Sequence, residues 1–263
     1  MSRQNNNEAV LSHQKTGSES TSHPMFKPYL IAIVILGLAA VVFSCQEVLR
    51  VSMGPQWIFL ASLSLLTGTF TIKVPGTKIK ISVAETFILT NLLLFGPAIG
   101  CLTAAIDGLL ASIRCKSGSR RFQCMLFNMS VMGLSALGAG GVFTLTGGRA
   151  FLFQGDGITL EDALLPLASM AVVYYLINTI AVAVIVGLER GQSIYRVWRD
   201  NFLWLATNYL TAAVVAGLLA LDARGITPGL LAVVLAILVS SYCVCRNYLH
   251  RSLQAGAVTA RAA

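Results

Sequence analysis

Two acidic side chains lie inside long apolar runs of this sequence, and they are the residues best suited to chemistry. Glu85 stands in the run ISVAETFILTNLLLF, and Asp107 stands in the run AIGCLTAAIDGLLA. A carboxylate in a lipid bilayer is costly unless it faces protein or water and has a partner. Such acids are suited to proton transfer, cation binding or polar contacts with a bound solute. The alternative is a structural role in hydrogen bonding between helices.

Several asparagines accompany the two acids in the apolar runs. At about 1.5 Å per residue, Glu85 and Asp107 lie roughly 8 to 10 Å inward from the nearest basic residue of the adjoining loop. Asn128 and Asn208 lie about as deep, whereas two further asparagines lie nearer the middle of their runs. The sequence therefore predicts a ligand-binding or polar cluster, with interhelical packing as the alternative. Its members are Glu85, Asn91, Asp107, Asn128, Asn178 and Asn208.

Catalytic and metal-binding motifs are absent from the sequence. The three histidines all lie near the termini, and the six cysteines show no zinc-ligand spacing, so we expect free thiols. No nucleotide-binding loop, H-E-x-x-H or G-x-S-x-G pattern occurs. We therefore expect no enzymatic activity, no catalytic residue, no metal and no cofactor.

The composition indicates where these residues reside. The chain is 56% hydrophobic and only 11% charged, whereas soluble domains carry roughly 25% charged residues. A helix needs roughly 17–25 apolar residues to cross a bilayer. The sequence thus predicts an all-α, polytopic membrane bundle of about eight transmembrane helices. The expected spans are 28–45, 57–73, 81–95, 98–114, 123–146, 163–187, 202–221 and 227–246. We expect a disordered tail over 1–25, the membrane domain over 26–247 and a short tail over 248–263.

The basic residues predict the orientation of these spans. With the spans above, all of the 19 lysines and arginines except Arg50, Arg149 and Arg224 fall on one side. Cytoplasmic loops carry such an excess. We therefore expect a bacterial inner-membrane protein with both termini in the cytoplasm. The positive-inside rule explains the positions of the basic residues better than nucleic-acid binding does, so we expect no nucleic-acid partner.

The loop over 188–201 mixes basic and aromatic residues close to the predicted membrane surface. We predict that it forms a short interfacial helix that contacts anionic lipid headgroups through Arg190, Arg196, Trp198 and Arg199. Each basic residue near such a surface contributes roughly 1 kcal/mol. Replacing Arg196 and Arg199 with Gln should therefore lower stability more in anionic than in neutral lipid. The alternative is that these residues only set the topology.

Three stretches resemble a known kind of membrane region. They are VPGTKIKISVAETFILTNLLLFGPAIGCLTAAIDGLLA (74–111), RRFQCMLFNMSVMGLSALGAG (120–140) and LERGQSIYRVWRDNFLWLATNYL (188–210). The chain is similar over 70–230 to the multi-span N-terminal regions of bacterial HD-GYP or GGDEF cyclic di-GMP signalling proteins. The resemblance implies a non-catalytic membrane sensor or interaction module. No output domain follows the last apolar run of this sequence, so we expect a separate cytoplasmic output protein as partner.

A shorter resemblance suggests a different function. The segment LLFGPAIGCLTAAIDGLL also looks like the substrate-binding membrane subunits of energy-coupling-factor vitamin transporters. That resemblance implies small-solute binding or transport together with an ATPase partner. The sensor function predicts an effect through a partner protein without turnover, whereas the transport function predicts a cavity lined by Glu85, Asp107 and Asn128 with saturable ligand binding.

Overall fold

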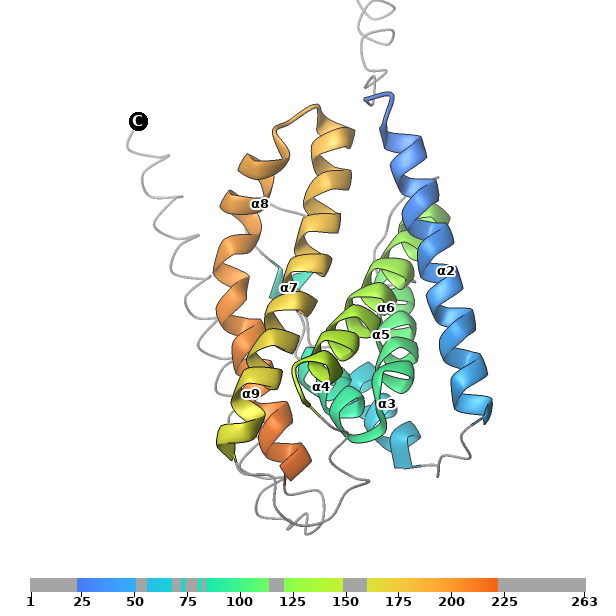
Figure 1. The fold of residues 1–263 in the computed structure, drawn as a ribbon. Helices are drawn as coiled ribbons and strands as arrows, with labels where there is room; N and C mark the ends of the chain where they lie inside the picture. Colours follow the sequence, from blue (N-terminus) through green and yellow to red (C-terminus); the bar gives the residue numbers. More distant parts are fainter. Residues whose placement is uncertain are drawn as a thin grey trace, which may run out of the picture.

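The computed structural model describes residues 23–50, 56–67, 72–73, 80–81, 84–113, 121–148 and 160–221. These residues form a helical bundle, shown in Figure 1. Its helices are α2 (Phe26–Arg50), α3 (Gln56–Thr67), α4 (Ala84–Phe95), α5 (Pro97–Ile113), α6 (Arg121–Leu145), α7 (Leu160–Arg190), α8 (Ile194–Phe202) and α9 (Ala206–Leu221), with a 3-10 turn, η2 (Leu203–Leu205), between α8 and α9. The prediction of an all-α, polytopic membrane bundle is confirmed.

Helix α4 lies in the interior of the bundle. All twelve of its residues are buried, and it packs against α3, α5, α6 and α9. Its sequence, AETFILTNLLLF, has apolar residues on every side, and a helix of that kind is stable only where every side is covered. The main hydrophobic core therefore runs from α4 through α5 and α6 to α7 and α9.

A tight turn joins α4 to α5, as the Gly96-Pro97 pair predicts. Gly96 has a φ of +95°, a conformation that favours glycine, and its N–H donates to the carbonyl of Leu92. Pro97 then occupies the first position of α5, where its fixed φ suits a helix and its missing N–H is not needed. The turn makes α4 and α5 antiparallel neighbours.

Three helices are long and apolar enough to span a membrane: α2, α6 and α7 over Ala163–Arg190. The pair Ile194–Phe202 and Ala206–Ala220, bent by 57°, makes a fourth if it counts as one span. Helices α3 and α4 have 12 residues each, which gives about 18 Å, against roughly 30 Å of hydrocarbon. By length and composition, three of the described helices, or four with the bent pair, are candidate spans, so the count of eight stays a prediction. The predicted eighth span, 227–246, lies outside the described residues.

The predictions for the second and third spans need correction at their facing ends. Helix α3 ends at Thr67 rather than at residue 73, and α4 begins at Ala84 rather than at residue 81. Residues Ile72–Lys73 (β1) and Lys80–Ile81 (β2) instead pair as short antiparallel strands. Isoleucines and lysines at these positions alternate, and alternation suits a strand better than a helix.

Helices α3 and α4 extend over only part of the height of the bundle. In Figure 1, α3 and α4 occupy the lower half of the bundle, whereas α2 and α7 extend along most of its height. The strands β1 and β2 lie near the middle of that height. Lys73 and Lys80, which pair in these strands, therefore do not lie at the upper end, where α2 begins and α7 meets α8. Irregular backbone at membrane depth is tolerated where protein encloses it.

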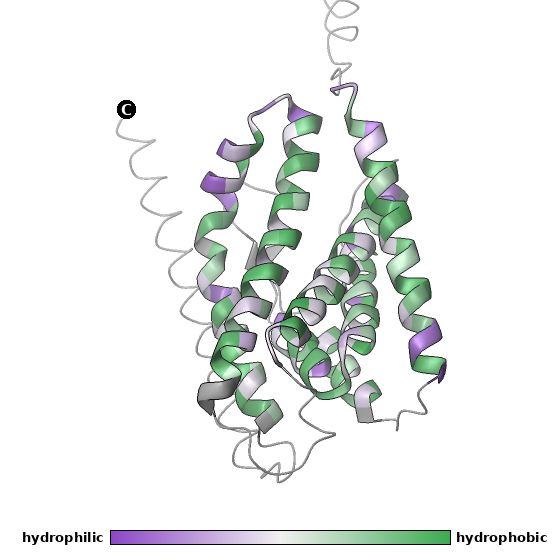
Figure 2. Ribbon diagram, in the orientation of Figure 1, coloured by the Kyte–Doolittle hydropathy of each residue, from purple (hydrophilic) through white to green (hydrophobic). Residues whose placement is uncertain are grey.

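The outer surface of the bundle is apolar. Figure 2 shows hydrophobic residues along most of each helix and hydrophilic residues gathered on α8 and at the lower end of α2. On α2, the side chains of Ile31, Ile35, Val42 and Phe43 are all more than half exposed. An exposed surface of that kind is stable when lipid covers it.

Candidate functional site

The two acidic residues lie side by side in the α4–α5 hairpin. The side-chain amide of Asn91 donates to Thr103 Oγ1 at 3.0 Å, which fixes the register of the two antiparallel helices. This register places Glu85 within about one turn of Asp107. Both side chains are buried, and their carboxyl groups are close enough for their charges to interact. The structure thus brings together the two residues at the centre of the predicted cluster.

Helix α5 presents polar side chains at intervals of about one turn. Thr103 accepts a hydrogen bond from Asn91 of α4, and Asp107 lies at about the level of Glu85. Ser112 accepts a hydrogen bond from Asn128 Nδ2 of α6 at 2.7 Å. The polar groups therefore form a ladder along α5. The backbone of Asn128 lies beside Gly108, next to Asp107, and its side chain reaches Ser112 about one turn further along α5.

Close packing of α5 against α6 holds the ladder in place. A Cβ atom added at Gly108 would lie 2.7 Å from the carbonyl oxygen of Asn128, so this position admits no larger side chain without a shift. Gly108 directly follows Asp107 in the sequence. The small residue on one side of α5 therefore lets α6 approach closely, and the neighbouring acid turns into the protein interior.

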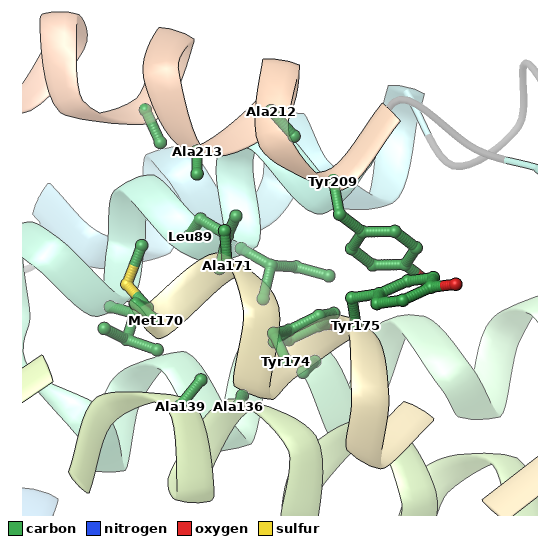
Figure 3. Close-up of a cluster of buried hydrophobic side chains, with 14 of the residues drawn as sticks. Leu89, Ala136, Ala139, Met170, Ala171, Tyr174, Tyr175, Tyr209, Ala212 and Ala213 are labelled. Atoms are coloured by element: carbon green, nitrogen blue, oxygen red, sulfur yellow. The ribbon is translucent and has the colours of Figure 1, made fainter. Parts of the chain in front are cut away.

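Two tyrosines complete the surroundings of the acids. Tyr174 of α7 and Tyr209 of α9 have their ring centroids 5.6 Å apart. Figure 3 shows Tyr174 and Tyr175 grouped with Tyr209 at one end of the buried apolar cluster. Tyr174 lies close enough to interact electrostatically with both Glu85 and Asp107, and Tyr209 does so with Glu85. Acidic and phenolic groups from four helices are thus near enough in the core to interact electrostatically.

The tyrosine group is anchored by hydrogen bonds to α7 and α8. Asn178 Nδ2 donates to the hydroxyl of Tyr209 at 2.8 Å, and the hydroxyl of Tyr175 donates to the carbonyl of Phe202 at 3.1 Å. The latter carbonyl lies at the end of α8, where helix carbonyls lack helical partners. The kink between α8 and α9 and the position of Tyr209 are therefore set by side chains of α7.

Several buried polar atoms near the acids lack a partner. Within the part of the chain that the structure describes, Glu85 Oε2, Asn91 Oδ1 and the hydroxyl of Tyr174 make no hydrogen bond. Each such atom carries a desolvation cost of about 1–3 kcal/mol, more for a charged group. Several buried polar groups without partners in one region lower the stability of the fold, so their presence there needs an explanation such as a functional role.

The remaining predicted site residues lie on α9 and around α8. Asn208 is half-buried on α9. Arg190, Arg196 and Arg199 are exposed around α8, whereas Val197 and Phe202 are buried. The indole of Trp198 donates to Thr179 Oγ1 at 3.0 Å and stands against Tyr175, so this side chain packs on α7. Headgroup binding by the four residues stays a prediction.

The sequence interpretation missed the tyrosines. Tyrosines are enriched at membrane interfaces, yet Tyr174 and Tyr175 stand in the middle of the apolar run of α7. A phenol buried there needs a polar partner, so two tyrosines in the middle of an apolar run could have indicated a polar group nearby. Among the described residues, no group of three or more His, Cys, Asp and Glu residues is placed to hold a metal ion.

The fold and the site define a class of protein: a polytopic helical membrane protein whose core contains polar groups from several helices. Comparison with known families is more specific. The MASE9 family model matches residues 55–243, which is more than half of the chain. The chain therefore belongs to the MASE9 family, one of the families of membrane-associated sensor domains. No curated protein and no solved structure gives a significant match.

The family match bears directly on the two resemblances seen in the sequence. It supports a membrane sensor region, and it spans α3 to α9 with both acids and all the tyrosines described above. It provides no support for an attached HD-GYP or GGDEF output domain, or for an energy-coupling-factor subunit.

Proposed function

We propose that this chain is a non-catalytic sensor module of the bacterial inner membrane, which binds a small molecule within its bundle and acts through a cytoplasmic partner protein. The observation that carries the proposal is the family match, because it covers the helices that supply the acids and tyrosines of the core. A sensor needs a site inside the membrane domain, and buried polar groups in membrane helices mark such sites.

The position of the basic residues supports a cytoplasmic partner at one end of the bundle. The backbone of His23, just before α2, donates to the carbonyl of Leu188 near the end of α7. The N-terminal end of α2 and the exposed arginines around α8 therefore lie at the same end. By the positive-inside rule, this end faces the cytoplasm.

The proposal can be tested with the full chain purified in a mild detergent. Mass spectrometry of extracted small molecules should find a ligand in about stoichiometric amount, and adding it back should stabilise the protein. The ligand should be recovered chemically unchanged after incubation. Recovery of an altered molecule would instead indicate an enzyme.

Reconstitution into sealed vesicles distinguishes sensing from transport, which is the alternative function that the sequence suggested. A sensor should show saturable binding with no accumulation of the ligand in the vesicle lumen beyond that of protein-free vesicles. Time-dependent uptake that requires the protein, with or without an added ATPase module, would overturn the sensor proposal.

A further inference from the structure

The buried groups around Glu85 indicate what kind of ligand the bundle would take. Glu85 and Asp107 are two buried carboxyl groups that lie close enough to interact electrostatically. Among the described residues, no ion pair joins a basic side chain to Glu85, since the ion pairs there involve Glu47 and Asp200. A buried carboxylate without a counter-charge favours a cation, because attraction between charges is strong where the dielectric is low.

Tyr174 provides a second observation, independent of the acids. Its side chain is fully buried, and its hydroxyl has no hydrogen-bond partner among the described residues. That hydroxyl lies close enough to both acids to interact with them electrostatically. A phenol oxygen and a carboxylate oxygen that both lack partners can each accept a hydrogen bond from the same donor.

The aromatic rings add to the preference for positive charge. Tyr209 packs on Tyr174 and on Tyr175 with ring centroids 5.6 Å apart in each case. The faces of aromatic rings attract cations, and this attraction is larger in a desolvated site. Ile88, Leu89 and Tyr174 are fully buried in one core cluster, and protein interiors are close-packed, so a group held among them must be small.

We infer that the site formed by Glu85, Asp107 and Tyr174 binds a small primary ammonium group, such as that of a protonated alkylamine. Such a group carries one positive charge and three N–H donors. It therefore matches both the charge of the acids and the unused acceptors at Glu85 Oε2 and the Tyr174 hydroxyl. The inference rests on the proposed sensor function, because it names the class of ligand that the sensor would detect.

Ethylammonium chloride is the probe that tests this inference, with the full chain in mild detergent at neutral pH, where alkylamines are protonated. Thermal unfolding should show a saturable rise of several degrees in Tm at constant ionic strength, because a ligand that binds only the folded state stabilises it. Tetramethylammonium chloride has the same charge and no N–H donor, so it should give no such rise. An equal rise with tetramethylammonium, or a rise with sodium chloride alone, would overturn the inference.

Three variants locate the effect. Glu85→Gln should weaken ethylammonium binding by about tenfold or more, since hydrogen bonds to charged groups contribute about 1.5–3 kcal/mol. Tyr174→Phe removes one acceptor and should weaken binding by a smaller factor, and it keeps the test decisive if Glu85→Gln does not fold. The control Glu47→Gln removes an acid from the surface of α2 and should leave binding unchanged. Unchanged binding in Tyr174→Phe, or in a folded Glu85→Gln, would contradict the assigned site.

The same probe separates this inference from the proposed function. If a molecule of another class stabilises the protein and ethylammonium does not, the ligand class is wrong while the sensor proposal stands. If ethylammonium binds but accumulates in sealed vesicles that contain the protein, the site stands and the sensor proposal fails.

Discussion

Two neighbouring residues of α5, Asp107 and Gly108, show how much depends on single side chains in this bundle. The acid is buried beside Glu85, and the glycine lets the backbone of α6 approach. The side chains of successive helical residues point about 100° apart, so one faces the polar interior while the other faces the neighbouring helix. Changes at these two positions should therefore act through different physical causes.

The first prediction concerns Asp107. Asp107→Asn keeps the shape and the hydrogen-bonding capacity of the side chain, so folding should be largely retained. Asp107→Leu removes that capacity and leaves nearby polar groups without a partner, which should cost about 1–3 kcal/mol. Thermal unfolding of both variants in detergent measures the difference.

A substitution on the adjacent, exposed face serves as control for Asp107. Ile106 is 41% exposed, so Ile106→Leu should change stability little. If Asp107→Leu proves as stable as Asp107→Asn, the polar ladder contributes nothing to the fold at this position.

At the scale of elements, helix packing depends on where small residues allow close approach. A contrast between polar and apolar helix faces says little about which helices meet, because lipid and protein core are both apolar. The contact between α5 and α6 at Gly108 is instead fixed by the distance to the backbone of Asn128. A backbone atom cannot rotate away as a side chain can, so a larger residue at this position must move a helix.

The second prediction compares two glycines in the bundle. Gly108→Ala should destabilise the protein by about 1–3 kcal/mol, which is typical of overpacking. Gly141→Ala is the matched control, because an added Cβ at Gly141 meets nothing within 4 Å. Removing a glycine from within a helix should stabilise it by roughly 0.5–1 kcal/mol. The two substitutions should change the free energy of unfolding in opposite directions, which thermal unfolding measures. Equal changes would mean that α6 moves freely on α5.

At the scale of the whole molecule, the arrangement predicts which loops share a side of the membrane. The start of α2, the end of α5, the start of α6 and the turn between α7 and α8 lie toward one end of the bundle. The end of α6 and the start of α7 lie toward the other end. Among the described residues, Lys27, Arg121, Arg190, Arg196 and Arg199 lie toward the first of these ends, so the positive-inside rule predicts that this end faces the cytoplasm.

The third prediction is the corresponding topology. Reporter fusions at residue 118, at residue 194 and at the C-terminus should read cytoplasmic, and a fusion near Gly155 should read periplasmic. A periplasmic signal at residue 194 would reverse the assignment of the α8 end. A periplasmic signal confined to the C-terminus would instead show that the count of crossings after α9 is wrong.

The sequence by itself determined the features that depend on local chemistry. Apolar runs located most of the helices, because a membrane helix must satisfy its backbone internally. The Gly96-Pro97 pair determined the hairpin of α4 and α5, since one residue supplies the left-handed turn and the next starts a helix. Antiparallel neighbours joined by so short a turn bring Glu85 and Asp107 to one level, which is why their proximity could be predicted.

Only the tertiary structure decided what surrounds the acids. Tyr174 and Tyr209 reach them from helices about 90 and 120 residues further along the chain, and no local pattern encodes such a meeting. The enclosure of α4 on all sides likewise depends on α3, α5, α6 and α9 packing around it. Its length alone does not show whether it crosses the membrane or lies within the protein. That outcome depends on which helices can approach closely, and side-chain volumes at distant positions set it.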